Sequence, residues 1–127
     1  MSKFIFALFL IFSSSTSAAD LWRTSDTYRE VTFQILNVID WGQTRYVAQH
    51  PDQYKENDMG RGGSAWLIGE HPSTTNVDRL MIATAILHPI ISYYLPHNWR
   101  EAFQYVTIGM KIDNTVGNFH AGVKFDF

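Results

Sequence analysis

The chain has 127 residues, of which 46% are hydrophobic and 17% are charged, with a formal net charge of −2 and no cysteine. This length suits one small domain. Ten basic against twelve acidic residues leave no positive footprint for nucleic acid, so we expect no nucleic-acid partner. The lack of cysteine excludes disulfide scaffolds, thiolate metal sites and cysteine nucleophiles.

The first nineteen residues have the order of a secretory signal. Lys3 precedes an unbroken apolar run, Phe4–Phe12, and small residues follow up to Ala19. A basic start, an apolar core and small residues before a cleavage site are typical of signal peptides. We therefore predict a signal peptide over residues 1–19 and a single mature domain over 20–127, exported to a bacterial cell envelope. The alternative is an uncleaved N-terminal anchor.

The first helix is predicted from about residue 27 to residue 49. Val31, Ile35 and Val38 recur at helical spacing, and polar residues lie on the opposite side. His50-Pro51 should end this helix, because the residue before proline is pushed out of the α region. The polar residues of this segment are Asn37, Asp40, Gln43 and Thr44.

Two further helices follow a polar connection over residues 52–76. The second is expected to begin in the N-cap cluster Ser73–Asn76, and the third after Asn98, which we predict as its N-cap, and to run to about Phe119. Residues 122–127 alternate in polarity, which favours a short extended tail. The predicted fold is all-α: a small bundle of about three helices with an extended C-terminal tail.

The stretch Leu80–Trp99 contains no Asp, Glu, Lys or Arg. A helix that is apolar on every face is either wrapped by protein or lies in lipid, and so small a chain offers little protein for wrapping. Twenty residues at 1.5 Å each would span about 30 Å, the thickness of a hydrocarbon core. We therefore predict a transmembrane helix, membrane lipid as a partner and an inner-membrane location, with periplasm and outer membrane as alternatives. The competing interpretation is a buried helix of a soluble bundle, ending at His88.

Charged residues in the flanking helices allow two interpretations. Asp40 in the first helix and Lys111 or Asp113 in the third interrupt otherwise uncharged runs. Within a membrane bundle such residues face the interior and pair. On amphipathic helices outside the membrane, they would instead face solvent.

Several of these residues carry a family resemblance. The helix motif Asp40-Trp41-Gly42-Gln43-Thr44, then Glu56-Asn57, then Gly69-Glu70-His71-Pro72-Ser73, resembles a family of small bacterial and prophage proteins with D-x-x-Q-T and E-x-N…G-x-x-P-S motifs. The chain departs from the pattern by lacking proline after Asn57 and by an insertion over residues 58–65. The resemblance implies a small helical membrane protein, a possible membrane-protein partner and no assigned reaction.

No catalytic motif stands out. None of the five histidines forms an i, i+4 pair, and the spacing does not support a zinc site built from Glu70, His71, Asp40 and His120. We therefore expect neither metal nor cofactor, and a non-enzymatic envelope or prophage-associated protein. The alternatives are a soluble periplasmic module and a small membrane enzyme or ion-handling protein using Asp40, His71 and Asp113. The candidate polar cluster comprises Asn37, Asp40, Gln43, Thr44, Glu56, Asn57, Glu70, His71, Asp113 and Asn118.

Overall fold

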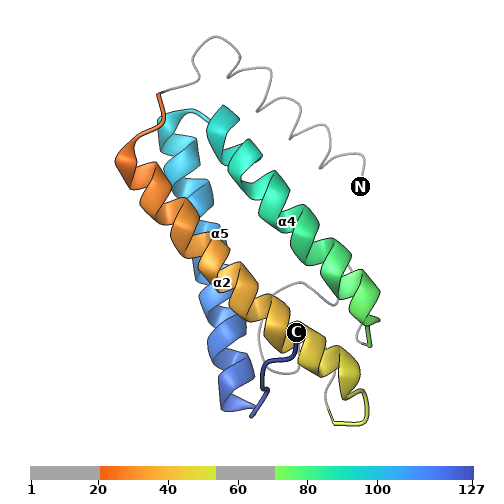
Figure 1. The fold of residues 1–127 in the computed structure, drawn as a ribbon. Helices are drawn as coiled ribbons and strands as arrows, with labels where there is room; N and C mark the ends of the chain where they lie inside the picture. Colours follow the sequence, from red (N-terminus) through yellow and green to blue (C-terminus); the bar gives the residue numbers. More distant parts are fainter. Residues whose placement is uncertain (1–20, 54–70) are drawn as a thin grey trace, which may run out of the picture.

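The computed structural model describes residues 21–53 and 71–127, which form three helices: α2 (Thr24–Gln49), α4 (Thr74–Tyr94) and α5 (His97–His120). Both α4 and α5 pack against α2, and they meet each other at a short turn (Figure 1). The described ranges contain no strand. The prediction of a small all-α bundle is confirmed. The predicted signal peptide lies outside the described residues.

α2 begins three residues before the predicted start because of an acidic cap. The carboxylate of Asp26 accepts a hydrogen bond from the backbone N–H of Arg23 at 2.8 Å, which satisfies a donor that the helix leaves open. The helix ends at Gln49, as predicted, ahead of His50-Pro51. There the ring nitrogen Nδ1 of His50 lies 2.8 Å from the carbonyl oxygen of Tyr46.

α4 begins in the predicted cluster and continues past its internal proline. The Ser73 hydroxyl accepts from the backbone N–H of Asn76 at 3.2 Å, so Ser73 is the N-cap. The helix passes through Pro89 and ends at Tyr94, so the alternative of a helix ending at His88 is wrong. α5 starts at His97 with Pro96 in the cap position, so Asn98 lies inside the helix and is not its N-cap.

The prediction of a transmembrane helix is wrong for the described part of the chain. None of its three helices combines the length and the apolar character needed to cross a membrane. The physical reason is that the charge-free stretch Leu80–Trp99 belongs to two helices, separated by Leu95-Pro96. Its part in α4, residues 80–94, is about 22 Å long at 1.5 Å per residue, against a hydrocarbon core of about 30 Å.

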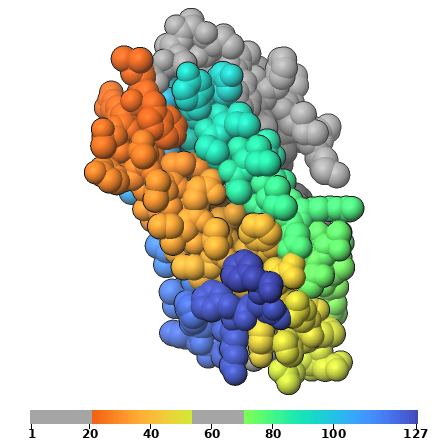
Figure 2. All heavy atoms as spheres, in the orientation of Figure 1, coloured from red at the N-terminus to blue at the C-terminus, as the bar shows by residue number. Residues whose placement is uncertain are grey.

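The C-terminal tail folds back onto α2, as Figure 2 shows. Gly122 has a φ of 82°, a left-handed conformation that glycine adopts without strain, and it turns the chain away from α5. The backbone N–H of Asp126 then donates to the carbonyl of Gly42 at 3.1 Å. A Cβ at Gly42 would lie 2.5 Å from the Phe127 ring, so the contact depends on glycine at this position.

The interior of the bundle is polar. In the described ranges thirteen polar or charged residues are buried, against six hydrophobic ones. Gln43, Arg100 and Gln104 are completely covered. The buried hydrophobic residues are Phe33, Val47, Val77, Met81, Leu95 and Val123.

Apolar side chains instead cover much of the outside. Val31, Ile35 and Val38, which define the apolar side of α2, are exposed, with Ile35 at 58%. α4 exposes Ile86 and Ile90 in the same way. The polar side of α2 is therefore the packed side, and the solvent-facing interpretation of Asp40 is wrong.

We expect Arg100→Met to lower the free energy of unfolding by about 3–5 kcal/mol, because the substitution leaves the buried carboxylate of Asp26 without one of its cationic partners. Chemical denaturation of the full chain measures this change. The control is Arg79→Met on the exposed surface of α4, which should stay within about 0.5 kcal/mol of the wild type. Equal effects of the two substitutions would contradict a stabilising role for the buried pair.

Candidate functional site

The first part of the polar interior is an ion cluster at the start of α2. Arg100 from α5 lies 2.8 Å from Asp26, with both side chains fully buried, and Arg29 pairs with the other oxygen of the same carboxylate. The Nε of Arg29 also donates to the Gln104 side chain at 2.8 Å. Arg100 further donates to the backbone carbonyl of Ser92 at 2.7 Å. Each buried charge here therefore has an opposite charge or a carbonyl beside it.

These partners hold Asp26 in its charged form. Burial raises the pKa of Asp26, but the hydrogen bond from the Arg23 backbone and the two guanidinium groups outweigh it, so the pKa lies below its usual value of 3.8. At the other end of α2, its residues Arg45 and Trp41 have a similar effect on the pKa of Asp78, which belongs to α4. Their hydrogen bonds, at 2.6 and 2.7 Å, lower the Asp78 pKa.

A second part of the interior joins all three helices through one imidazole. Nδ1 of His88 in α4 lies 2.7 Å from Oε2 of Glu30 in α2, and Nε2 lies 2.7 Å from the Thr107 hydroxyl in α5. Burial raises the pKa of Glu30, but hydrogen bonds from His88, Gln34 and Gln104 bring it below its usual value of 4.5. Glu30 is thus an ionised acceptor, and Nδ1 of His88 carries a proton toward it.

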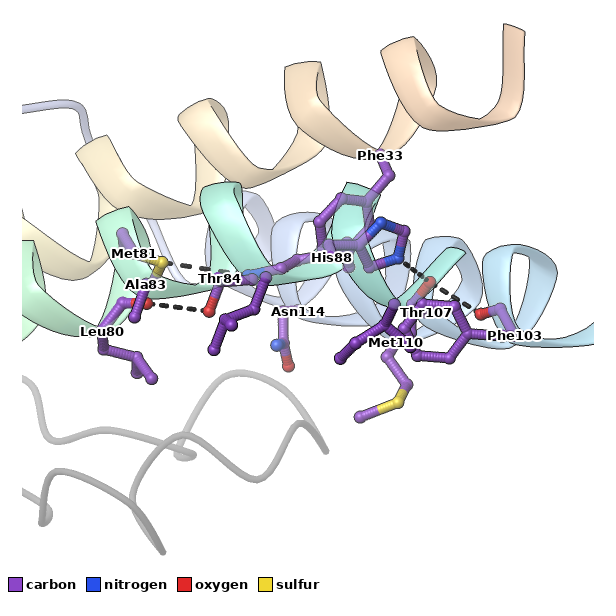
Figure 3. A pocket seen from close by; sticks show the side chains of 13 residues that line it. Phe33, Leu80, Met81, Ala83, Thr84, His88, Phe103, Thr107, Met110 and Asn114 are labelled. Carbon is purple, nitrogen blue, oxygen red and sulfur yellow. Dashed lines mark hydrogen bonds between the residues drawn. The ribbon is translucent and has the colours of Figure 1, made fainter. Parts of the chain in front are cut away.

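Two aromatic rings fix the plane of this imidazole. Phe33 stacks on His88 at 3.5 Å between ring centroids with an interplanar angle of 6°, and Phe103 stacks at 4.7 Å and 26°. The rings leave His88 free to make hydrogen bonds only in its own plane. His88, Phe33, Thr107 and Phe103 gather at one point between the helices (Figure 3).

The order carboxylate–imidazole–hydroxyl resembles a catalytic relay, but the hydroxyl group is placed differently. The Thr107 oxygen also lies 2.8 Å from the carbonyl of Phe103 and 3.0 Å from that of Gln104. A single hydroxyl proton therefore has two backbone acceptors in addition to the imidazole. A nucleophile needs a base that takes its proton without such competition, so the geometry favours a structural link over nucleophilic catalysis.

The third part of the interior pairs Asp40 with Lys111. The ammonium nitrogen of Lys111 lies 2.6 Å from Oδ2 of Asp40, whose side chain is almost fully buried, while that of Lys111 is 14% exposed. Thr44 donates to the same carboxylate at 3.3 Å. One turn further, Asn118 donates to Gln43 at 2.9 Å.

An apolar groove opens between α4 and α5 beside these polar links, with a cavity volume of about 480 Å³. Lys111 and Asn114 line it toward the end away from the helix turn, and Ile91 and Phe103 line it near that turn. Phe33 contributes from α2, and Figure 3 shows the side chains that surround the opening. The remaining lining residues are Leu80, Met81, Ala83, Thr84, Leu87, His88, Thr107 and Met110.

The structure brings together only part of the candidate polar cluster. Asn37, Asp40, Gln43 and Thr44 share the buried side of α2, where Asn37 donates to the carbonyl of Met81 at 3.2 Å. Asn118 joins them from α5 through Gln43, whereas His71 and Asp113 are exposed. Glu56, Asn57 and Glu70 lie outside the described residues. The described ranges contain no group of three residues suited to hold a metal ion.

Most of the polar residues that link the helices were missed from the sequence: Asp26, Arg29, Glu30, His88, Arg100, Gln104 and Thr107. Lys111 was not missed, since it is one of the charged residues expected to face the interior and pair. A polar stripe along α5 would have revealed three of the missed residues, because Arg100, Gln104, Thr107, Lys111, Thr115 and Asn118 follow at steps of three and four residues.

Comparison of the chain with protein families, with curated proteins and with solved structures found no match.

Acid should weaken the bundle through Asp26 and Glu30, the two buried carboxyl groups whose pKa values are lowered. Asp26 and Glu30 have folded-state pKa values below 3.8 and 4.5, so their stabilisation is complete above pH 4.5 and is lost as the pH falls through the folded values. We expect the free energy of unfolding, measured by denaturation at a series of pH values, to decline below pH 4.5. Asp26→Asn should make this decline shallower. The control Asp52→Asn, at an exposed position, should leave the decline as in the wild type.

Thr107→Val should destabilise the bundle by about 1–3 kcal/mol, because it leaves Nε2 of the buried His88 without a partner. Thr84→Val is a matched control. Its hydroxyl makes the same hydrogen bond to the carbonyl four residues earlier, at 2.8 Å, and it also lines the groove. Thermal and chemical denaturation compare the two. A Thr84→Val effect as large as that of Thr107→Val would remove the assignment of a linking role to Thr107.

Proposed function

We propose that the protein is a non-enzymatic binding protein of the bacterial cell envelope, which holds an apolar acyl chain in the groove between α4 and α5. The observation that carries this proposal is the groove itself. Ligand sites are concave, mostly apolar and about 300–1,000 Å³ in volume, with a few polar groups that fix orientation. The groove of about 480 Å³ falls in this range and has Lys111, Thr107 and Asn114 among its apolar side chains.

The exposed apolar side chains at the mouth of the groove also support binding as the activity. Proteins rarely leave large contiguous apolar areas exposed unless those areas contact something. Leu87, at the groove, is 53% exposed, and Met110 opposite it is 51% exposed. These side chains offer apolar area to a ligand at the mouth of the groove.

The buried ionic groups do not favour a reaction as the alternative activity. The enzyme alternative relied on Asp40, His71 and Asp113. Asp40 is paired with Lys111 inside the bundle, whereas His71 and Asp113 lie on the surface, so the three candidates do not form a common buried site. The envelope location is supported by the signal-like order of residues 1–19.

Filling the groove should abolish binding. We expect the methyl ester of a saturated fatty acid, titrated into the full chain labelled at its methionine methyl groups, to shift the signals of Met81 and Met110 in a saturable way, because both line the groove. Ala83→Phe places a ring among the lining side chains and should weaken the apparent affinity at least tenfold, about 1.4 kcal/mol.

The control for this experiment is Ala102→Phe. Ala102 is an exposed alanine on α5 that does not line the groove, so a ring there adds the same apolar area without filling the cavity. It should bind as the wild type does. Absence of saturable shifts at Met81 and Met110 in the wild type would overturn the proposed function.

A further inference from the structure

The ammonium of Lys111 has a hydrogen-bonding capacity that the bundle does not use. An ammonium group carries three N–H donors. One is directed to Asp40 at 2.6 Å and a weak one to the sulfur of Met81 at 3.9 Å. Among the described residues no second oxygen accepts from Lys111, although its side chain is only 14% exposed and lines the groove.

The charge at this point is already balanced. Asp40 neutralises Lys111, and its carboxylate has one further hydrogen bond, from Thr44 at 3.3 Å. A ligand carboxylate beside Lys111 would lie close to the buried carboxylate of Asp40 and be repelled by it. An uncharged oxygen acceptor would take the remaining donor without this cost.

The apolar part of the groove runs from Lys111 toward the turn between α4 and α5. Leu87 and Ile91 line one wall and Phe103 the other, and Ile91 and Phe103 are the lining residues nearest to the turn in sequence. Among the described residues, a chain that starts at Lys111 and runs toward the turn therefore meets mostly carbon-rich side chains, together with Thr84 and the His88–Thr107 link. The groove has a polar end and an apolar end.

We propose that the ligand is an uncharged acyl compound, an ester or amide, whose carbonyl oxygen accepts a hydrogen bond from Lys111 while its chain lies along Leu87, Ile91 and Phe103. This inference rests on the proposed function and adds to it the chemical class of the ligand and the residue that selects it. Lys111 acts as a specificity-determining residue through its third N–H, and Asp40 acts as a filter against anionic ligands.

The test compares three probes of equal chain length: a fatty-acid methyl ester, the corresponding carboxylate and the corresponding alkane, each delivered from cyclodextrin. The methionine methyl signals of Met81 and Met110 report binding. In the wild type the ester should bind about tenfold more tightly than the alkane, because a hydrogen bond from a charged donor adds to the apolar contact. The ester should also bind more tightly than the ionised carboxylate.

Two variants separate the donor from the fold. Lys111→Met keeps the apolar stem and removes the donor, so ester affinity should fall about tenfold, to that of the alkane, while alkane affinity stays within twofold. Because Lys111→Met leaves Asp40 unpaired, the double variant Asp40→Asn/Lys111→Met is measured beside it. The double variant removes both charges and should give the same loss for the ester.

The single variant Asp40→Asn gives the sharpest result. It leaves Lys111 without its counter-charge, so the preference should reverse and the carboxylate should bind more tightly than the ester. A carboxylate preference already present in the wild type, or equal binding of ester and alkane, would overturn the assignment of an uncharged acyl ligand while leaving the groove as a binding site. Failure of all three probes to bind would instead overturn the proposed function.

Discussion

The pairing of buried charges is the constraint on which the whole bundle depends. Asp26 and Glu30 lie one turn apart on α2, inside the structure, and neither could remain ionised there without partners. Arg100 from α5 pairs with Asp26, and His88 from α4 lies within hydrogen-bond distance of Glu30. Each of the two outer helices is thereby fixed to α2 at a defined height, because an ion pair or a hydrogen bond to a carboxylate has a narrow geometry whereas apolar contact does not.

The polar interior also determines what lies outside. α2 has a polar side and an apolar side, and only one can face the neighbouring helices. Since Asn37, Asp40 and Thr44 occupy the packed side, Val31, Ile35 and Val38 are turned outward. The apolar surface is therefore a direct consequence of the ionic core.

How far the sequence could predict this arrangement depends on the feature. The C-terminal end of α2 and the cap of α4 followed from His50-Pro51 and Ser73, because proline and capping side chains act within a few residues. The polar side of α2 was also visible, but its burial was only one of two interpretations, since the usual association of apolar residues with the core indicates the opposite side. The overestimate of the apolar helix had a similar cause: composition does not show that Leu95-Pro96 divides the stretch between two helices.

The partners of the buried charges depend on contacts between distant segments, and local patterns do not specify them. Glu30 and His88 are 58 positions apart, and Asp26 and Arg100 are 74 apart.

The groove was not predicted from the sequence for the same reason, because its walls come from segments that are far apart in the chain. α4 and α5 are each held by α2, and His88 links them through Thr107 near their turn. Beyond that link the described side chains that line the groove are mainly apolar up to Lys111, whose counter-charge is Asp40. We therefore expect a ligand that enters there to meet the N–H of Lys111 that no oxygen of the described residues accepts. The proposed binding site thus lies where the ionic network that builds the bundle reaches its edge.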